Sequence, residues 1–429
     1  LPYAAQRRAL APPPNGPRRI VLATAIAETS LTIPGVTVVV DAGRARRARF
    51  DPASGMSRLV TERASRAEAE QRRGRAGRVA PGICYRLWAR AEEGAMPAFA
   101  PPEIETADLA PLALELAAWG SPEGAGLAFL TPPPAGPLAE ARALLAELGA
   151  LDEAGRITAH GRALAGLPLH PRLGHMLALA GREAAPLAAL LSDRDPLRGA
   201  SSDLGLRLAA LRGAPVAAEA DAGALARIRA EARRLASLAP AAPPHPGLSP
   251  GGMASLAYPD RIALRRPGEA PRFVLSGGRG AVLDPADPLR DAPLLAVADL
   301  DGAGREARIR LAAALPEPEL RALHGERIRR EEAVAWSSRE GRILARRRER
   351  LGALTLSETP LPDPDPEAIA AAALEGLRDR GLPWTKEAAR LRARIALTGT
   401  DVSDAALLAE PSWLLPHLAS VRTAADLAA

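Results

Sequence analysis

The chain has 429 residues, of which 47% are hydrophobic and 25% are charged, and its formal net charge of +6 permits a polyanionic partner without identifying one. This length and apolar content are enough for more than one buried core, so we expect two to four domains. Cys84 is the only cysteine and no apolar stretch reaches the roughly 18 residues that span a bilayer, which excludes a disulfide framework, a thiolate-rich zinc site and a membrane-spanning helix, and fits a reducing cytoplasm.

The first ninety residues alternate between strand and helix patterns. Two β-branched apolar runs, residues 20–22 and 36–40, flank a segment with Thr and Ser, which predicts a strand, a loop or short helix, and a second strand. Residues 65–78 are rich in Ala, Glu, Gln and Arg and end in Gly-x-x-Gly, so they predict a helix that closes at Gly77. Residues 83–88 predict another strand. We therefore expect a layered α/β sheet that is cut short at the N-terminus.

The pattern changes to helices rich in Leu and Ala from about residue 103, for example at residues 109–119 and 137–148. Residues 212–252 predict a helix followed by a Pro-rich linker, and we place a domain boundary there. Short strand-like runs, separated by Gly, Asp and Pro turns, follow at residues 272–275, 294–300 and 307–311. These runs predict a small β-barrel or sandwich, with helices at the C-terminus.

Arginine gathers between residues 41 and 90. This stretch holds 13 Arg against 5 acidic residues, a local balance of +8 that exceeds the +6 of the whole chain. Its densest part is the octamer Gln-Arg-Arg-Gly-Arg-Ala-Gly-Arg at residues 71–78. Arg75 and Arg78 are one helical turn apart, so both guanidinium groups can project from one helix face toward a shared anion.

The other residues of the octamer also fit a phosphate-facing cluster. Gly74 and Gly77 permit a close approach of the backbone to a ligand, and Gln71, one turn earlier, is placed to orient a water or a phosphate oxygen. The alternative is that the arginines form a solvated helix face, as charge runs usually do. The interleaved Gly and Gln favour the phosphate-facing interpretation.

The octamer resembles motif VI of superfamily-2 helicases of the DEAH class. Residues 23–33, Ala-Thr-Ala-Ile-Ala-Glu-Thr-Ser-Leu-Thr-Ile, resemble motif V of the same family, at the spacing expected within one RecA-like domain. The resemblance implies two RecA-like domains with ATP in the cleft between them, of which this chain carries the second. It also implies that Arg75 and Arg78 act as arginine fingers on the γ-phosphate, and that Gln71 and Gly74 lie beside the nucleotide.

The resemblance to motif V implies contacts with RNA. Thr24 is the residue expected to contact the RNA backbone, and Glu28, Thr29 and Ser30 would link that contact to the nucleotide. Ala25 stands where the family usually has Asn, so any contact made by that amide is missing. Because aromatic residues are only 3% of the chain, a platform that stacks several bases is not expected, and the partner should be single-stranded RNA held through its backbone without sequence preference.

Longer segments resemble the bacterial HrpB branch of this family. They are residues 48–52, 55–59, 81–88, 148–152, 157–161, 167–173, 256–261 and 276–281. The resemblance implies a multidomain fold, α/β plus α. Its parts are a second RecA-like domain at residues 1–90, truncated at its N-terminus, a helicase-associated winged-helix and helical-bundle region at 91–245, and an HrpB-type C-terminal region at 246–429 with a small barrel-like part and helices.

The sequence lacks the motifs that hold the ATP phosphates in such enzymes. Lys386 is the only lysine and stands between Thr385 and Glu387, so no P-loop is present. Residues 152–155, Asp-Glu-Ala-Gly, look superficially like a DEAH box but predict a turn. Because the chain starts at Leu1, we expect a C-terminal fragment that is inactive alone, with ATP and Mg²⁺ held mainly by a first RecA-like domain outside it.

Three further features have ordinary interpretations. We expect His170 and His175 to be packing or surface residues, and no metal site is expected. The arginines at residues 342–350 predict a solvated helix face or a phosphate contact, and residues 277–280 predict a strand turn. The sequence therefore favours the C-terminal part of an ATP-dependent RNA helicase. A non-catalytic nucleic-acid-binding module is the alternative, and a scaffold that recruits a partner protein is a weaker one.

Overall fold

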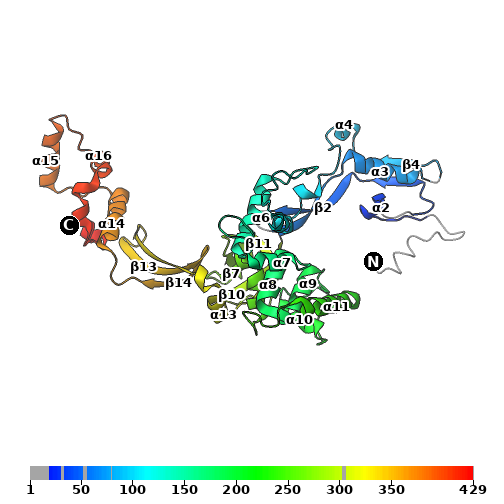
Figure 1. Ribbon diagram of the computed structural model, residues 1–429. Coiled ribbons are helices and arrows are strands. Elements are labelled where there is room, and N and C mark those ends of the chain that lie inside the picture. Colours follow the sequence, from blue (N-terminus) through cyan, green and yellow to red (C-terminus); the bar gives the residue numbers. More distant parts are fainter. Residues whose placement is uncertain (1–18, 30–32, 52–55, 79, 302–305, 429) are drawn as a thin grey trace. The chain divides into compact units, whose positions relative to one another are not determined.

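The computed structural model describes residues 19–29, 33–51, 56–78, 80–301 and 306–428 (Figure 1). The described chain forms two compact units. The first is built from residues up to Ser192 and from Ala232–Pro244, and the second from Asp193–Glu231 and from His245 onward. None of the described helices is both long and apolar enough to span a bilayer.

The first unit begins with an α/β part and continues as helices. The α/β part contains α2 (Ile26–Thr29), β1 (Val38–Asp41), β2 (Arg44–Asp51), β3 (Met56–Arg63), α3 (Arg66–Ala76), β4 (Ile83–Arg86) and α4 (Arg90–Glu93). The helices that follow are α5 (Ala110–Trp119), α6 (Ala135–Glu147), α7 (Ala159–Ala165), α8 (Pro171–Ala180) and α9 (Ala185–Ser192), with 3-10 turns at Glu103–Glu105 and Gly181–Ala184.

Two small sheets and one helix make the α/β part. β1 and β4 pair in parallel with Val38 opposite Ile83, β2 and β3 form an antiparallel hairpin, and α3 packs on β1 and β4. The chain can reach this arrangement because Gly82 has no side chain: a Cβ there would collide with the carbonyl oxygens of Ala76 and Thr37. Gly82 therefore fixes the end of α3 against the start of the parallel pair.

The apolar core beneath α3 is small. It consists of Ala45, Ala64, Ala69 and Met96, with Trp88 packed against it. These side chains bury little apolar area, so they contribute little hydrophobic free energy to this part of the fold. Polar contacts from Arg72 and Arg47 must therefore help to fix the position of α3.

The helical region of the first unit has a larger core of Leu and Ala. The apolar stripes of α5 and α6 face one another through residues such as Leu114 and Leu145, both less than 5% exposed. A short bridge between Leu151 and Ile157 closes a two-stranded turn between α6 and α7. The turn contains residues 152–155, which confirms the expected turn at the Asp-Glu-Ala-Gly sequence.

The second unit contains a barrel, a three-stranded sheet and terminal helices. Its first elements are β5 (Leu197–Arg198), α10 (Leu204–Leu211), β6 (Glu219–Ala220), α11 (Ala222–Leu238, whose last turns belong to the first unit) and α12 (Pro250–Ala257). The strands and helix that follow are β7 (Ile262–Arg265), β8 (Arg272–Leu275), β9 (Gly280–Val282), β10 (Leu294–Asp301), β11 (Glu306–Ala314) and α13 (Glu317–His324). The last are β12 (Arg329–Ser337), β13 (Arg342–Leu351), β14 (Leu354–Pro360), α14 (Pro366–Arg380), α15 (Lys386–Ala396), α16 (Asp404–Ala409), α17 (Leu415–Leu418) and α18 (Ala424–Ala428), with 3-10 turns at Pro259–Arg261, Gly325–Arg327 and Pro411–Trp413.

The barrel closes in the order β10-β11-β9-β8-β7. The Val, Ile, Leu and Ala residues of these strands fill its interior, and Phe273 and Leu295 are fully buried. The expected barrel or sandwich is thus a barrel, and the predicted strands at 272–275, 294–300 and 307–311 correspond to β8, β10 and β11. The expected turn at residues 277–280 lies between β8 and β9.

A three-stranded antiparallel sheet, β12-β13-β14, follows the barrel, and α14 packs on β12. The expectation of a helix for the arginines at residues 342–350 is wrong, because they lie on β13. Their neighbours across the sheet explain the difference: Arg347 pairs with Glu332 on β12, and Arg348 with Glu358 on β14. These cross-strand ion pairs complement charges on adjacent strands, which a helix would have separated.

The predicted α/β elements β1, α3 and β4 are where the sequence placed them, whereas the hairpin β2–β3 was not predicted and one predicted strand does not form. Helix α3 ends at Ala76 with Gly77 after it, and β4 begins at Ile83, as expected. Residues 20–22 were expected to form a strand and do not. Ile20 and Leu22 are 89% and 95% exposed, and their backbone finds no neighbouring strand among the described residues. A β-branched run without a pairing partner does not become a strand.

A buried histidine lies between α12 and α13 in the second unit. His324 is 4% exposed, and its Nε2 lies 2.9 Å from the Oγ of Ser255, which is fully buried. Burial, together with the charges of Arg327 and His245, lowers the pKa of His324 to about 4. The ring is therefore neutral in the folded protein at neutral pH.

We predict that acid destabilises the second unit before its carboxylates are protonated. In the unfolded chain His324 is protonated below its ordinary pKa of 6.5, whereas in the folded protein it stays neutral down to about pH 4. The free energy of unfolding therefore falls as the pH drops through this window. The loss should reach about 3 kcal/mol. Thermal unfolding at pH 4.5 and 7 measures it. His324→Gln should reduce the pH dependence, and replacement of the exposed His417 should leave it unchanged.

Candidate functional site

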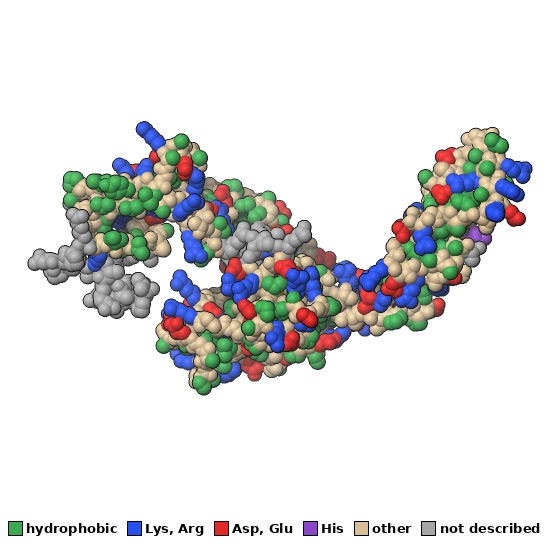
Figure 2. Space-filling view, turned by 180° about the vertical axis from the view of Figure 1, so that it is seen from behind, with side chains coloured by type: hydrophobic (Ala, Val, Ile, Leu, Met, Phe, Trp, Pro, Cys, Tyr) green, Lys and Arg blue, Asp and Glu red, His purple; other side chains and the backbone are tan. Residues whose placement is uncertain are grey.

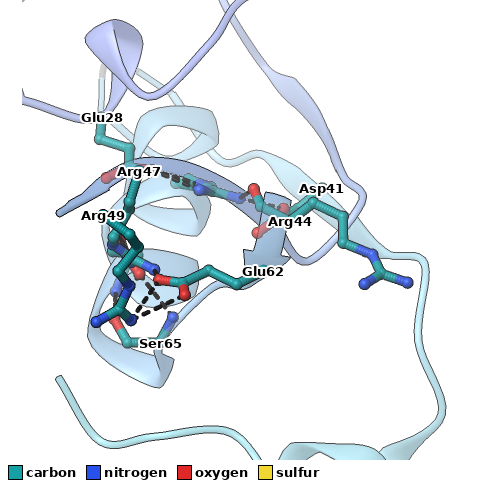
Figure 3. A network of polar contacts seen from close by, with 9 residues as sticks. Glu28, Asp41, Arg44, Arg47, Arg49, Glu62 and Ser65 are labelled. Atoms are coloured by element: carbon teal, nitrogen blue, oxygen red, sulfur yellow. Dashed lines mark hydrogen bonds and ion pairs between the residues drawn. The ribbon is translucent and has the colours of Figure 1, made fainter. Parts of the chain in front are cut away.

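The N-terminal end of α3 is fixed by a capping box and an arginine from the hairpin. Ser65 Oγ accepts a hydrogen bond from the backbone N–H of Glu68 at 3.2 Å, and the Glu68 carboxylate accepts from the Ser65 N–H at 2.6 Å. Arg47 on β2 donates to both Glu68 and Glu62, and Arg49 donates to Glu62 at 2.8 Å (Figure 3). Helix α3 therefore starts at a fixed point on the hairpin.

These ion pairs shift the carboxylate pKa values. Burial raises the pKa of Glu68, but its hydrogen bonds from Ser65 and Arg47 outweigh that effect and lower it below the usual value. The pKa of Glu62 is lowered in the same way, because the guanidinium groups of Arg49 and Arg47 outweigh the effect of burial. Both carboxylates are ionised at neutral pH and hold the arginines in place.

Arg72 joins the C-terminal half of α3 to two other elements. Its Nε donates to Glu28 of α2 at 2.7 Å, its Nη1 donates to Asp41 at the end of β1 at 2.8 Å, and Nη1 also reaches the carbonyl oxygen of Arg44 at 3.1 Å. The side chains are largely buried, with 16% of Arg72, 11% of Glu28 and 2% of Asp41 exposed. Burial lowers the pKa of Arg72, and the two carboxylates more than compensate and raise it. One guanidinium thus ties α2, β1 and α3 together.

Asp41 depends on this guanidinium. It stands at the carboxyl end of β1, where its Oδ1 accepts hydrogen bonds from the Gly43 N–H at 2.9 Å and from Arg72. Its Oδ2 is buried and has no hydrogen-bond partner among the described residues. A buried carboxylate with a half-satisfied set of hydrogen bonds is costly unless a cation stays beside it. Arg72 is that cation.

The expected phosphate-facing residues lie on and just beyond the last turns of α3. Gln71 is exposed, and Arg75 is half-buried and donates to the backbone carbonyl of Glu28. Arg78 lies past the end of the helix, since α3 closes at Ala76 with Gly77 as its C-cap. The expectation that Arg75 and Arg78 share one helix face is therefore wrong. Arg75 lies in the last turn of α3, whereas the position of Arg78 depends on the turn that follows the helix.

The glycines of the octamer leave open space. A Cβ added at Gly74 or at Gly77 would meet no atom of the described structure within 4 Å. The two glycines therefore leave room for a ligand to approach the backbone closely, as the sequence analysis expected. In the sequence, Gln71 precedes these glycines and Arg78 follows them, and both side chains are exposed. Arg78 makes no hydrogen bond or ion pair with any described residue.

The motif V segment lies against α3 through α2. Thr24 is exposed, and its carbonyl oxygen accepts from the Ala27 N–H at 3.0 Å at the start of the helix. Thr29 ends α2, and Ser30 lies outside the described residues. The carboxylate of Glu28 is held by Arg72 and its carbonyl by Arg75, so Glu28 contacts α3 and is not left open to a ligand.

Sequence reasoning missed the residues that hold the site together. Arg72 was read only as part of a basic octamer, and Asp41, Arg47 and Glu68 were not singled out. One signal was present: Asp41 directly follows an apolar run, a position that places a carboxylate at the carboxyl edge of a parallel sheet. Its pairing with Arg72, 31 residues later, had no local signal.

The histidines singled out in the sequence each contact another side chain. His170 caps α8 and lies 3.0 Å from Asp108, and His175 lies 2.8 Å from His160. Where the structure describes the chain, His, Cys, Asp and Glu side chains do not gather in groups of three or more that would hold a metal ion.

Comparison with known proteins relates the whole chain to one group. The family description "Helicase conserved C-terminal domain" matches residues 1–80, "Helicase associated domain (HA2), winged-helix" matches 141–169, and "ATP-dependent RNA helicase HrpB, connector region" matches 327–361. The chain is 38% identical over 439 aligned residues to the ATP-dependent RNA helicase HrpB of Escherichia coli (strain K12), which covers 97% of this chain and 52% of the relative.

Two further comparisons agree. The pre-mRNA-splicing factor ATP-dependent RNA helicase prp22 of Schizosaccharomyces pombe is 43% identical over 178 residues, which cover 41% of this chain and 15% of the relative. The crystal structure of the E. coli DExH-box NTPase HrpB superposes with a TM-score of 0.72 at 36% identity, covering 100% of this chain and 53% of that one. This chain thus spans about half the length of the HrpB proteins that it matches.

We predict that Arg72→Ala loosens the contact between α2, β1 and α3. Loss of the guanidinium leaves the buried Asp41 carboxylate unpaired, which should cost about 2–3 kcal/mol after allowance for partial exposure. The neighbouring Arg73 contacts Glu70 with both side chains more than half exposed, so Arg73→Ala should have little effect on stability. Amide hydrogen exchange of α3 measures both, and equal protection in the two variants would contradict the assignment.

Proposed function

This chain belongs to the HrpB family of ATP-dependent RNA helicases, and from that membership we propose that it supplies the half of the motor that closes on the ATP phosphates and contacts RNA. The observation that carries the proposal is the hydrogen bond between Arg72 and Glu28, which joins the helix of the arginine octamer to the motif V segment. A motor that couples nucleotide to nucleic acid needs a rigid connection between the two. Arg72 provides one.

The nucleotide side of the site consists of donors around an open helix end. Arg75 and Arg78 would act as arginine fingers on the γ-phosphate, because a guanidinium keeps its charge and its planar fork matches phosphate oxygens. The charge that spreads over the transferred phosphoryl group in the transition state is what they would stabilise. Gln71 would orient the attacking water or a phosphate oxygen. The open surface at Gly74 is consistent with an approaching nucleotide.

The described residues do not supply a complete ATP site. Without a P-loop, the chain would bind ATP with Mg²⁺ mainly through a partner RecA-like domain, and the metal ion would neutralise charge on the phosphates when bound. The octamer residues fit the far side of such a nucleotide because they offer hydrogen-bond donors and open backbone. We therefore propose that this chain has no turnover alone. The single cysteine, Cys84, supports the further proposal that the protein acts in the reducing cytoplasm.

The RNA side of the site is the segment from Thr24 to Ser30. Thr24 is exposed and would donate its hydroxyl to an RNA phosphate, with Thr29 and Ser30 close behind it in the chain. Such contacts hold the backbone and carry no sequence information. The substrate we propose is therefore single-stranded RNA of any sequence.

We predict that Arg78→Ala abolishes RNA-stimulated ATP hydrolysis by the full-length protein of this gene. An arginine finger contributes about 10³-fold or more to turnover, so kcat should fall by at least that factor. Arg73→Ala removes an exposed arginine from the last turns of α3, five residues before Arg78, and should leave kcat unchanged. Steady-state hydrolysis with and without oligouridylate measures both.

Binding of RNA by the Arg78→Ala protein should stay close to wild type, because Arg78 is assigned to the nucleotide. Unchanged turnover in Arg78→Ala would refute the motor assignment and leave a non-catalytic nucleic-acid-binding module. Turnover that falls equally in Arg73→Ala would show that helix charge, and not a finger, matters.

We also predict a gain of affinity from Ala25→Asn. Ala25 is exposed beside Thr24, and an amide at this place adds a donor and an acceptor toward the RNA backbone. One added hydrogen bond should lower the RNA concentration for half-maximal stimulation about threefold to tenfold. Ala25→Leu, which adds bulk without donors, is the control and should not tighten binding.

A further inference from the structure

Helix α15 is held to the protein by one polar cluster. Arg392 stacks over the ring of Trp384 at 4.4 Å and donates to Asp404 at 2.8 Å and to the carbonyl oxygen of Val402 at 2.6 Å. Thr385 caps the helix by accepting from the Ala388 N–H at 3.1 Å. None of the residues of α15 is buried. A helix of this length is marginal in water by itself, so these contacts hold in place a helix that contributes little to any core.

The outer surface of α15 carries a row of cations, which we call the α15 ridge: Lys386, Arg390 and Arg394. The three residues follow one another at intervals of four, so they lie along one side of the helix about 6 Å apart. All three are exposed, and none forms an ion pair with a carboxylate in the part of the chain that the structure describes. Figure 2 shows basic side chains gathered at the edge of the C-terminal helices.

The arginines of the preceding sheet differ from the ridge. On β13, Arg346 and Arg348 contact Glu358, and Arg347 contacts Glu332. Each of these three arginines lies in an ion pair within the sheet. The ridge residues form no such ion pair within the described parts of the chain, so their charge is available to an anionic partner.

We propose that the α15 ridge binds the phosphate backbone of RNA, as a contact additional to the one at motif V. This inference rests on the proposed function for the identity of the polyanion. Evenly spaced cations on a stiff helix suit a chain of evenly spaced phosphates. Such contacts do not depend on the RNA sequence. The ridge would keep RNA on the protein while the motor segment releases and rebinds it.

The helix surface favours RNA over a protein or a membrane. Leu391 and Ile395 are the apolar side chains exposed next to the ridge, at 56% and 37%. They share their row with Glu387, so a carboxylate heads the apolar side of the helix. An acidic peptide or an anionic lipid surface would meet that carboxylate where it needs apolar contact, whereas the cation row itself contains no acidic residue.

A footprint on Lys386 tests the contact directly. Lys386 is the only lysine of this chain, so acetylation by an amine-reactive reagent reports on the ridge at one peptide. Oligouridylate should reduce the labelling rate of Lys386 in the full-length protein at low salt, and high salt should restore it. Labelling that oligouridylate leaves unchanged at low salt would overturn the proposal.

Binding measurements supply the second test. The variant Lys386→Ala, Arg390→Ala, Arg394→Ala should bind oligouridylate about tenfold more weakly, and the slope of log K against log salt should fall in magnitude by about 2. Its kcat at saturating RNA should equal wild type. Arg390→Lys with Arg394→Lys keeps the charge and should bind like wild type.

The control variant Leu391→Ser, Ile395→Ser should bind RNA like wild type. A loss as large as that of the cation variant would overturn the proposal in favour of an apolar partner, as would an unchanged salt slope in the cation variant. Failure of the proposed function looks different, because wild type would then show no RNA-stimulated turnover while the Lys386 footprint still reports on the ridge.

Discussion

A single guanidinium group, that of Arg72, is the constraint on which the α/β part of this chain depends. The apolar core beneath α3 is made mainly of alanines, so hydrophobic burial alone does not define where the helix lies. Arg72 satisfies two carboxylates and a carbonyl oxygen at once, and one of those carboxylates belongs to the buried Asp41. The positions of α2, β1 and α3 are thereby linked through one side chain.

This linkage gives the octamer two separate tasks. Its largely buried arginine, Arg72, holds the fold, whereas Gln71 and Arg78 are exposed and are the residues that we propose to face a ligand. Arg75 is between the two, half-buried and bonded to the backbone of Glu28. A ligand that moved Arg75 would therefore act on the motif V segment through the hydrogen bond to Glu28. Charge-rich sequences that look uniform thus divide by position into structural and ligand-facing residues.

Local sequence patterns predicted several helices and strands whose formation depends mainly on their own residues. The capped helix α3, the Leu and Ala helices and the barrel strands β8, β10 and β11 are each specified by their own periodicity and turn residues, whereas the short strands β7 and β9 were not predicted. The strand predicted at residues 20–22 does not form, because a strand needs a partner strand to pair with. The arginines of β13 were misread because their glutamate partners lie on neighbouring strands and not four residues away.

The sequence proposed candidate site residues but not their arrangement. Gln71, Arg75, Arg78 and Thr24 stay predictions from the octamer and the motif V segment, whereas the contact between Arg72 and Glu28 joins residues 44 positions apart and had no local signal. The helix end at Ala76 also decides where Arg78 goes, and one residue more or less of helix would turn its side chain by about 100°. Periodicity cannot specify a boundary that finely.

The three-stranded sheet has a consequence for how copies of the protein meet. Its order leaves β12 and β14 at the edges, where unpaired backbone groups invite strands from other molecules. Edge strand β12 begins with Arg329, Arg330, Glu331 and Glu332, and edge strand β14 carries Glu358 and ends at Pro360, so a second copy would have to match these charges in register before its backbone could pair. The sheet is therefore a poor template for fibril growth, and concentrated salt, by screening these charges, removes part of that protection.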